Sequence, residues 1–388
     1  MKISIVGAGN AGCFTALHFA WFTRKSGIEI ELIHNPDILP EKVGQATLLS
    51  PPEILYGATR ADWYNNPFKA TPKTGILYEG WGKVNEKVFH AFPLDRLAVH
   101  FCPSLMQEWV LNCGLFKVVE GDVSDISNID SDYIIDCRGR PDDFSDYDNL
   151  INPINAAILG KPKWDTIKDL WSGHVATPDG WTFVIPAHPS SPSHEGSVGY
   201  LYNSNVSSQE DAEKNFIEQF DVEITRHIRF NNYVTKNPIV DNRIFLNGNR
   251  LFFLEPLEAT ALETYCYWTR YMFDMIIHRR NSHDQPLDFK VATNDIHTHI
   301  ERCQNFVLWH YQFGSKYNTP FWDYAKSLPF KDAELNRFIN VAKKIDWNDV
   351  MTYDHYGGSN VPQINKYNQY GSWTPVNLKY WIDGMLVP

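Results

Sequence analysis

The chain has 388 residues, 43% of them hydrophobic and 21% charged, as in ordinary folded globular proteins. Its 35 Lys and Arg against 46 Asp and Glu leave a net charge of −11, which argues against a nucleic-acid partner. Six cysteines without a C-x-x-C pair predict reduced thiols and no metal site. We find neither a signal peptide nor an apolar run near ~18 residues, so we expect a cytoplasmic protein without membrane spans.

The first elements in chain order predict a dinucleotide-binding turn. A strand over residues 2–6 leads directly into Gly7-Ala8-Gly9-Asn10-Ala11-Gly12, a helical pattern over residues 13–24 and a second strand over 28–33. This is G-x-G-x-x-G in its strand–turn–helix setting; a glycine turn without a ligand is the alternative. The expected pyrophosphate contacts are Gly7, Gly9, Asn10, Ala11 and Gly12. His34 stands where such folds usually carry a ribose-binding acid.

The remaining elements predict an α/β fold with a doubly wound core, an inserted antiparallel sheet and a helical C-terminal part. We expect strands at 75–78, 88–92, 116–120 and 133–136, and antiparallel strands within 180–206. Helical patterns cover 95–113, 208–230, 260–279, 295–314 and 332–344, and an irregular packed tail forms the last forty residues. The division we expect is a core over 1–290 and a mainly helical substrate-side part over 291–388.

The most informative segment is Leu254-Glu255-Pro256-Leu257-Glu258-Ala259-Thr260-Ala261. It holds two carboxylates three residues apart with no charged neighbour. If Pro256 lies near a helix start, the amides that follow could point at an anion. The alternative is that Glu255 and Glu258 are ordinary acids of a first helical turn, favoured by the helix dipole.

Two further segments are suggestive without being decisive. Asp136 follows a buried strand in Asp136-Cys137-Arg138-Gly139-Arg140, which is typical of a second flavin-contacting turn and equally of a plain strand-end turn. In the segment from Gly180 to Pro186, alternation places Trp181, Phe183 and Ile185 on one face of a strand. A hydrophobic sheet face explains that pattern as well.

Together these residues resemble the flavin-dependent halogenases of the tryptophan-halogenase family. The family's W-x-W-x-I-P motif has its counterpart in Trp181, Phe183, Ile185 and Pro186, and its L-E-P-L-E-S-T-G motif in residues 254–261. The other similar motifs are Gly199-Tyr200-Leu201-Tyr202-Asn203-Ser204, Thr319-Pro320-Phe321-Trp322, Lys73 before Ile76, Tyr78 and Trp81, and the pair His90 and Phe92. They span roughly residues 3–325 in the family's order.

The resemblance implies an FAD-binding halogenase core supplied with FADH2 by a separate flavin reductase. Halide held at Thr260 and Ala261 would be oxidised with O2 to hypohalous acid, which passes to Lys73. Glu258 would polarise the oxidant or accept the arene proton. Gln45, Ala46, Asp136 and Leu254 would contact the flavin together with the glycine turn. His90 and Phe92 would sandwich a planar arene, while Trp181, Phe183 and Ile185 would block the space above the flavin. Alone, Lys73 would be taken for a solvated lysine and His90 for a core histidine.

Three departures from the family pattern shape the expected function. Gln45 stands where the family usually has Glu, Ala261 replaces a glycine, and the tail beyond Trp322 is short. We therefore expect an open pocket that takes indoles, phenols or similar arenes, with self-association left open. The alternatives are a flavin monooxygenase that hydroxylates an aromatic, which needs no Lys73 and Glu258, or a flavin-binding protein without activity.

Overall fold

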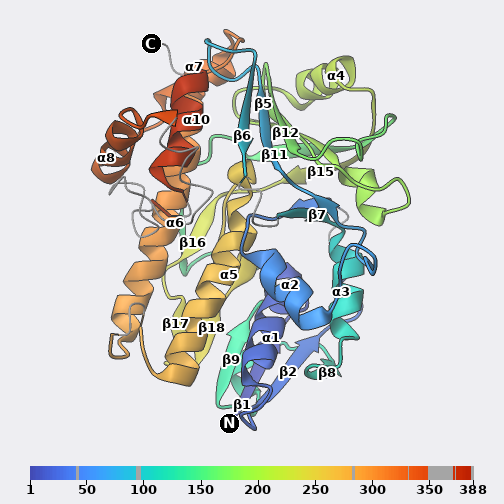
Figure 1. Ribbon diagram of the computed structural model, residues 1–388, viewed down its shortest axis with the longest axis vertical. Helices are drawn as coiled ribbons and strands as arrows, with labels where there is room; N and C mark the ends of the chain where they lie inside the picture. Colours follow the sequence, from blue (N-terminus) through green and yellow to red (C-terminus); the bar gives the residue numbers. More distant parts are fainter. Residues whose placement is uncertain are drawn as a thin grey trace.

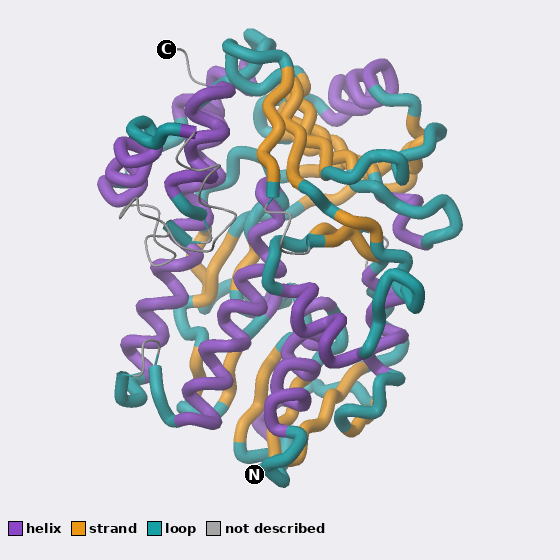
Figure 2. Tube along the Cα trace, viewed as in Figure 1, coloured by secondary structure: helices purple, strands orange, loops and turns teal. Residues whose placement is uncertain are grey.

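The computed structural model describes residues 1–40, 43–92, 98–281, 285–330, 332–347, 370–371 and 373–385. Two large sheets occupy opposite ends of the molecule, as Figure 1 shows. The helices α5 (Thr260–Phe273) and α6 (Phe289–Gln312) pack against each other; in Figure 1, α5 runs from the centre toward the lower end and α6 runs along the left side. Figure 2 shows the longer helices along the left side and the strands of the sheet at the upper end of the molecule on the right.

The six-stranded sheet near the N-terminus is the doubly wound core that the sequence predicts. Its order is β17-β18-β9-β1-β2-β8, parallel except for β17. The helix α1 (Asn10–Thr23) makes the crossover from β1 to β2, as in a βαβ unit. The strands are β1 (Lys2–Val6), β2 (Glu29–His34), β8 (Lys117–Glu120), β9 (Tyr133–Asp136), β17 (Ile239–Val240) and β18 (Ile244–Leu246).

The seven-stranded sheet contains the antiparallel strands expected within 180–206. Its order is β15-β11-β14-β13-β12-β5-β6, and the β5–β12 pair alone is parallel. Alternate residues of each strand face the helices or the outer surface. The strands are β5 (Gly75–Glu79), β6 (Lys87–Ala91), β11 (Ala156–Pro162), β12 (Ser172–Thr177), β13 (Gly180–Val184), β14 (Val198–Tyr202) and β15 (Val222–Arg229).

Two small antiparallel sheets and the remaining helices complete the described fold. The small sheets comprise β3 (Gln45–Ala46), β4 (Thr71–Pro72) and β7 (Val99–Phe101), and β10 (Tyr147–Asn149), β16 (Tyr233–Thr235) and β19 (Phe252–Phe253). The other helices are α2 (Pro51–Thr59), α3 (Pro103–Leu111), α4 (Gln209–Gln219), α7 (Pro320–Ser327), α8 (Ala333–Ala342) and α10 (Pro375–Met385). None of the described helices is long and apolar enough to cross a membrane.

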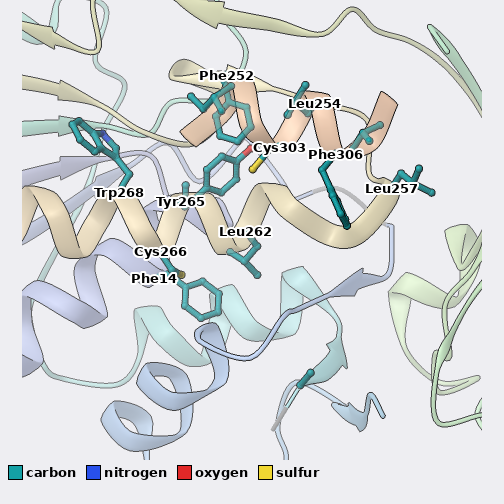
Figure 3. Close-up of a cluster of buried hydrophobic side chains, with 14 of the residues drawn as sticks. Phe14, Phe252, Leu254, Leu257, Leu262, Tyr265, Cys266, Trp268, Cys303 and Phe306 are labelled. Atoms are coloured by element: carbon teal, nitrogen blue, oxygen red, sulfur yellow. The ribbon is translucent and has the colours of Figure 1, made fainter. Parts of the chain in front are cut away.

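The hydrophobic core follows α5 from its first residue. Figure 3 shows Leu254, Leu257 and Phe306 gathered at the beginning of this helix, and Tyr265 and Trp268 further along it. All five side chains are buried. The segment that carries the two glutamates therefore packs against buried apolar side chains.

The helix expected over residues 95–113 is wrong in its first part. Residues 93–97 lie outside the described residues, and residues 99–101 form β7, which pairs with β3 and β4. The helix begins only at Pro103, a residue suited to the first helical position because its missing N–H is not needed there. Buried bonds from His100 to Thr71 and Ser172 hold the strand.

Two further expectations are wrong. The helix expected over 208–230 ends at Gln219, and residues 222–229 form β15 against β11. The β-branched residues Val222, Ile224, Thr225 and Ile228 favour a strand there, and pairing with β11 decides the conformation. In the tail, residues 348–369 lie outside the described residues, but α10 is a regular helix where irregular chain was expected.

Candidate active site

Lys73 is the first of two buried charged groups at the centre of the structure. It lies between β4 and β5, is 3% exposed, and its Nζ donates to the carbonyl oxygen of Thr47 at 3.2 Å. Burial lowers the pKa of the amine to about 7, and the nearby Glu258 carboxylate offsets only part of this shift. A large share of neutral amine is therefore present at neutral pH, unlike in a solvated lysine.

Glu258 is not an ordinary acid of a first helical turn. Its side chain is fully buried, and its backbone has φ 70° and ψ 3°, followed by Ala259 at φ 53° and ψ 34°. Left-handed backbone costs roughly 1–2 kcal/mol for each residue with a side chain. Two such residues in succession turn the Glu258 carboxylate inward just before α5, and strain of this kind concentrates at functional sites.

His310, on α6, is a site residue that the sequence did not reveal. Its Nε2 lies 3.2 Å from Glu258 Oε1, and both side chains are fully buried. The contact is within ion-pair distance, although the two atoms are not aligned as a hydrogen bond. The only sequence signal is a histidine in an apolar helix, which usually marks a satisfied core residue.

The start of α5 offers unused hydrogen-bond donors to an anion. Thr260 is 2% exposed, and its Oγ1 has no partner among the described residues. The preceding Ala259 supplies no side-chain cap, and Ala261 follows, half-buried. A buried helix N-terminus without a cap leaves amides and partial positive charge unsatisfied. The residues present thus fit a halide at the position expected for Thr260 and Ala261.

Glu255 has a different part from Glu258. Its Oε1 accepts a hydrogen bond from Tyr311 at 2.6 Å, and the Tyr311 oxygen accepts one from Trp181 Nε1 at 3.1 Å. Burial raises the pKa of Glu255 to about 8, although the bonds from these partners oppose the shift. The first glutamate of the motif therefore anchors Trp181 on β13.

The T-P-F-W box docks α7 onto the hairpin that carries Trp181. Thr319 Oγ1 donates to Pro178 O at 2.6 Å, and Trp322 Nε1 donates to Thr177 O at 2.8 Å. Trp81 meets Trp322 edge to face at 5.2 Å. In this structure the box fixes the wall behind Trp181.

The turn after β1 fits a dinucleotide. Gly7 has φ +100°, and a Cβ on it would lie 2.5 Å from the Cys137 carbonyl oxygen. A Cβ on Gly12 would lie 1.7 Å from the Gly7 oxygen, whereas one on Gly9 would meet nothing within 4 Å. The start of α1, with Asn10 and Ala11, has no side-chain cap and no acid in its first turn. The open space at Gly9 beside an uncapped helix start suits a pyrophosphate.

The other residues expected at the cofactor fall into two places. His34 ends β2 and Asp136 ends β9. These two strands flank β1, so both residues lie at the carboxyl ends of the strands, where the glycine turn follows β1. The Asp136 carboxylate is bound by Arg138 at 3.0 and 2.9 Å, so it is engaged within the protein. Gln45 and Ala46 are half-buried in β3 and follow Gly44, where a Cβ would lie 3.1 Å from Ile185. Leu254 is buried in the core beside α5.

His90 and Phe92 do not form the expected sandwich. Their rings meet edge to face, with centroids 5.5 Å apart and planes at 79°, so no second ring fits between them. Instead Trp381 of α10 faces His90 at 4.3 Å, and Asn377 Nδ2 lies 3.1 Å from His90 Nε2. Burial lowers the pKa of His90 to about 3, so the imidazole is neutral and accepts the Asn377 bond.

The helix α10 therefore closes this side of the centre, where an open pocket was expected. Trp381 is fully buried and also contacts Tyr78, Phe306 and His310. Lys73 Nζ lies 5.1 Å from the centre of the Phe92 ring. The aromatic wall beside Lys73 is thus built by Phe92, His90 and a tryptophan that the sequence did not single out.

A cavity of about 420 Å³ lies on the opposite face of the seven-stranded sheet. Its lining includes Leu77, Glu79 and Val175, which alternate along β5 and β12 with the inward residues Tyr78 and His174. The cavity is therefore separated from Lys73 by the sheet. The described residues also contain no cluster of His, Cys, Asp and Glu suited to a metal ion.

Comparison with known proteins defines the class of protein. The family model for tryptophan halogenases matches residues 2–112 and 122–376, so this chain belongs to the tryptophan halogenase family. The resemblance drawn from the motifs is thereby confirmed.

Individual relatives are distant. Tryptophan 7-halogenase RebH of Lentzea aerocolonigenes is 24% identical over 219 residues, which are 52% of this chain and 39% of RebH. The structure of MibH, a tryptophan 5-halogenase, is 17% identical with a TM-score of 0.77 and covers 100% of this chain and 86% of MibH. The structure of a tryptophan halogenase of Shewanella frigidimarina is 16% identical with a TM-score of 0.76. It covers 99% of this chain and 88% of that protein. These structures confirm the expected fold, and the chain spans about two fifths of the curated relative's length.

Proposed function

We propose that this chain is an FADH2-dependent halogenase that makes hypohalous acid from halide and O2 and halogenates a small arene. The observation that carries the proposal is Lys73, a buried amine whose pKa is lowered to about 7, electrostatically coupled to the buried Glu258. Burying a charged group is costly unless a function uses it, so two such groups close together indicate a functional site. Membership of the tryptophan halogenase family supports the same reaction.

FAD is the cofactor that the family implies, and when bound as FADH2 it would supply the electrons that activate O2. Gly7, Gly9, Asn10, Ala11 and Gly12 would hold its pyrophosphate. His34 would hydrogen-bond a ribose less strongly than the usual carboxylate, so we propose weak binding and delivery of FADH2 by a separate flavin reductase. Gln45, Ala46, Asp136 and Leu254 would complete the cofactor contacts.

Halide would be bound at the start of α5, by the Thr260 hydroxyl and the amides of Thr260 and Ala261. The unsatisfied Oγ1 of Thr260 supports this. Trp181, Phe183 and Ile185 would form the wall that keeps the arene away from the flavin. The Glu255–Tyr311–Trp181 chain of hydrogen bonds holds that wall in place.

Lys73 would receive the hypohalous acid, either as a haloamine or through a hydrogen bond, because a neutral amine is nucleophilic and an ammonium is not. Glu258 would polarise the oxidant or accept the proton that the arene loses. The substrate ring would lie along the wall of Phe92, His90 and Trp381, within reach of Lys73. Indoles, phenols and similar flat arenes fit such an aromatic wall.

The test is mass spectrometry of indoles and phenols incubated with the protein, FAD, a flavin reductase, NADH and one halide at a time. Halogenated products that disappear in Lys73→Ala, while flavin oxidation and peroxide release continue, would support the proposal. Equal yield from Lys73→Ala would mean that free hypohalous acid does the halogenating. Hydroxylated products would favour the monooxygenase, and flavin binding with no product from any arene would favour an inactive homologue.

Three broader features belong to the same proposal. The six cysteines are all free thiols, which supports a reducing, cytoplasmic location. We propose that the chain divides near residue 290 into a core and a mainly helical part, and that the later part contributes His310 and Trp381 to the substrate side. Self-association is tested by the mass measured in light scattering.

A further inference from the structure

The Glu258–His310 contact fixes a proton count. His310 Nδ1 lies 2.8 Å from the carbonyl oxygen of Phe306. A carbonyl oxygen only accepts hydrogen bonds, so Nδ1 carries a hydrogen. In a neutral imidazole Nε2 then presents a lone pair, and this atom lies 3.2 Å from Glu258 Oε1.

A lone pair this close to a carboxylate oxygen in a fully buried place is repulsive, and both atoms lack a hydrogen-bond partner among the described residues. One additional proton removes the conflict, either on Nε2 as an imidazolium or on Glu258 as a carboxylic acid. Neither carboxylate oxygen of Glu258 has another hydrogen-bond partner in the part of the chain that the structure describes. The pair is therefore most stable when one proton is carried by one of its two members.

The surrounding groups leave this proton to the pair. His90 on β6 and His174 on β12 are both neutral, because burial and then the neighbouring charges of His310 and Lys73 lower the pKa of each. Tyr78 on β5 stacks on the His310 ring at 5.7 Å, and Trp381 of α10 covers its edge at 4.9 Å. Lys73 is the remaining ionisable group coupled to Glu258.

We propose that Glu258 and His310 hold one proton between them and use it in the halogen-transfer step, with His310 as the positioning residue that acts through Glu258. The inference rests on the proposed halogenase function. Halogen transfer needs both an acid and a base. A pair that holds one proton can donate it as an acid and then, as a base, take up the proton that the arene loses.

The step balances in atoms and electrons. A π-electron pair of the arene forms the carbon–halogen bond, and the halogen–oxygen bond breaks with its electrons passing to oxygen. That oxygen takes the shared proton from Glu258 and leaves as water. The carbon–hydrogen bond then breaks, its electrons restore the aromatic ring, and the proton returns to the Glu258 carboxylate. The arene carbon is oxidised by two electrons and the halogen is reduced by two.

The first test measures the proton without turnover. Nitrogen NMR of the flavin-free protein with 15N-labelled histidine, together with infrared spectra, is recorded near pH 8. Histidines of ordinary pKa near 6.5 are mostly neutral there. We expect either an imidazolium signal that His310→Gln removes, or a buried carboxylic acid band that Glu258→Gln removes. If both are absent, the shared proton does not exist and the proposal is overturned, whatever the halogenase activity.

The second test separates proton sharing from simple support of Glu258. Glutamine at 310 keeps an N–H donor toward Glu258 but holds no labile proton, whereas phenylalanine keeps only the ring packing. We expect His310→Gln and His310→Phe both to lose on the order of 10²-fold in kcat, the scale of acid–base help, with peroxide release unchanged. The matched control is His299→Gln, a buried histidine on the same helix that stacks on Tyr267, which should keep wild-type turnover.

Full activity in His310→Gln would show that His310 only orients Glu258, and would overturn the proton role. A wild-type protein that halogenates no arene, yet shows the shared proton, would refute the proposed function and with it the use of the proton. The two failures are thus distinguishable, because the spectra do not depend on turnover.

Discussion

Gly199 on β14 makes room for the ring of Phe183 on β13. The two residues are cross-strand partners, and a Cβ on Gly199 would lie 2.2 Å from the Phe183 ring. The glycine of the Gly-Tyr-x-Tyr run and the second aromatic of the W-x-W-x-I-P motif are therefore one structural unit. Phe183 in turn meets Trp181 edge to face at 6.5 Å.

We expect Gly199→Ala to destabilise the protein by about 1–3 kcal/mol, the usual cost of overpacking a core. Urea unfolding followed by fluorescence measures it. The control is Gly57→Ala in α2, an exposed helical position where a Cβ meets nothing within 4 Å. That change should stabilise the protein by roughly 0.5–1 kcal/mol, and equal effects from both would contradict the packing argument.

Replacing Lys73 with Met should stabilise the protein in a pH-dependent way. The amine has its ordinary pKa of 10.5 when unfolded and about 7 when folded, so between these values the unfolded chain binds one more proton and wild-type stability rises with pH. The cost of burying the charge is fully present below pH 7 and fades toward pH 10.5. At 1.36 kcal/mol per pKa unit the upper bound of this cost is roughly 5 kcal/mol, a figure that already includes the attraction to Glu258.

Unfolding free energies of wild type and Lys73→Met, measured from pH 6 to pH 10, test this expectation. The gap should be largest at pH 6 and close toward pH 10. The exposed Lys25 provides the control, because Lys25→Met should show no such gap. A gap at Lys73 that stays constant with pH would mean that the amine has the same pKa in the folded and the unfolded protein, so that burial does not shift it.

Gly9→Ala should separate flavin binding from folding. The added methyl group meets nothing within 4 Å in the protein, so the flavin-free stability should change by less than about 0.5 kcal/mol. FAD affinity, measured by quenching of protein fluorescence, should fall because the methyl group intrudes on the pyrophosphate space. Gly12→Ala is the contrasting variant, since its Cβ would lie 1.7 Å from the Gly7 oxygen and should disturb the fold itself.

We also expect the wild-type protein to be isolated mostly without flavin, because His34 replaces the usual ribose acid. Stoichiometric FAD that survives dialysis would contradict this. The comparison needs only the absorbance of the purified protein.

Trp381 should set the size of the arene that the protein accepts. Trp381→Phe keeps an aromatic face toward His90 but shortens it, so we expect faster reaction with fused-ring arenes and little change with single-ring phenols. Each gained or lost apolar contact is worth about 1–3 kcal/mol. Bromide and iodide should be used at least as well as chloride. The measurement is kcat/KM across an arene panel, with Trp268→Phe on α5 as the control for loss of a buried tryptophan.

A Trp381→Phe profile identical to wild type would remove Trp381 from the substrate wall. Strict use of tryptophan with one chlorinated product would contradict the broader arene class. Either result leaves the Lys73 test informative.

The sequence by itself determined the family, the dinucleotide turn and the parallel core, because these depend on local order. The glycine turn needs only a strand before it and a helix after it, and β1, α1 and β2 formed where the pattern of residues 2–33 placed them. The Leu254–Ala261 segment and the Trp181 strand stood out for the same reason. Their unusual residues are adjacent or alternate in the chain.

The tertiary structure decided the features that depend on partners far away in sequence. Residues 222–229 became a strand through pairing with β11, although the preceding helix suggested continuation. His310 and Trp381 come from helices 52 and 123 residues beyond Glu258, and only packing brings them to the centre. The pKa and the protonation of a buried charged group depend on such neighbours. The chemistry of Lys73 and Glu258 therefore follows from the fold, and the motifs that contain these residues do not show it.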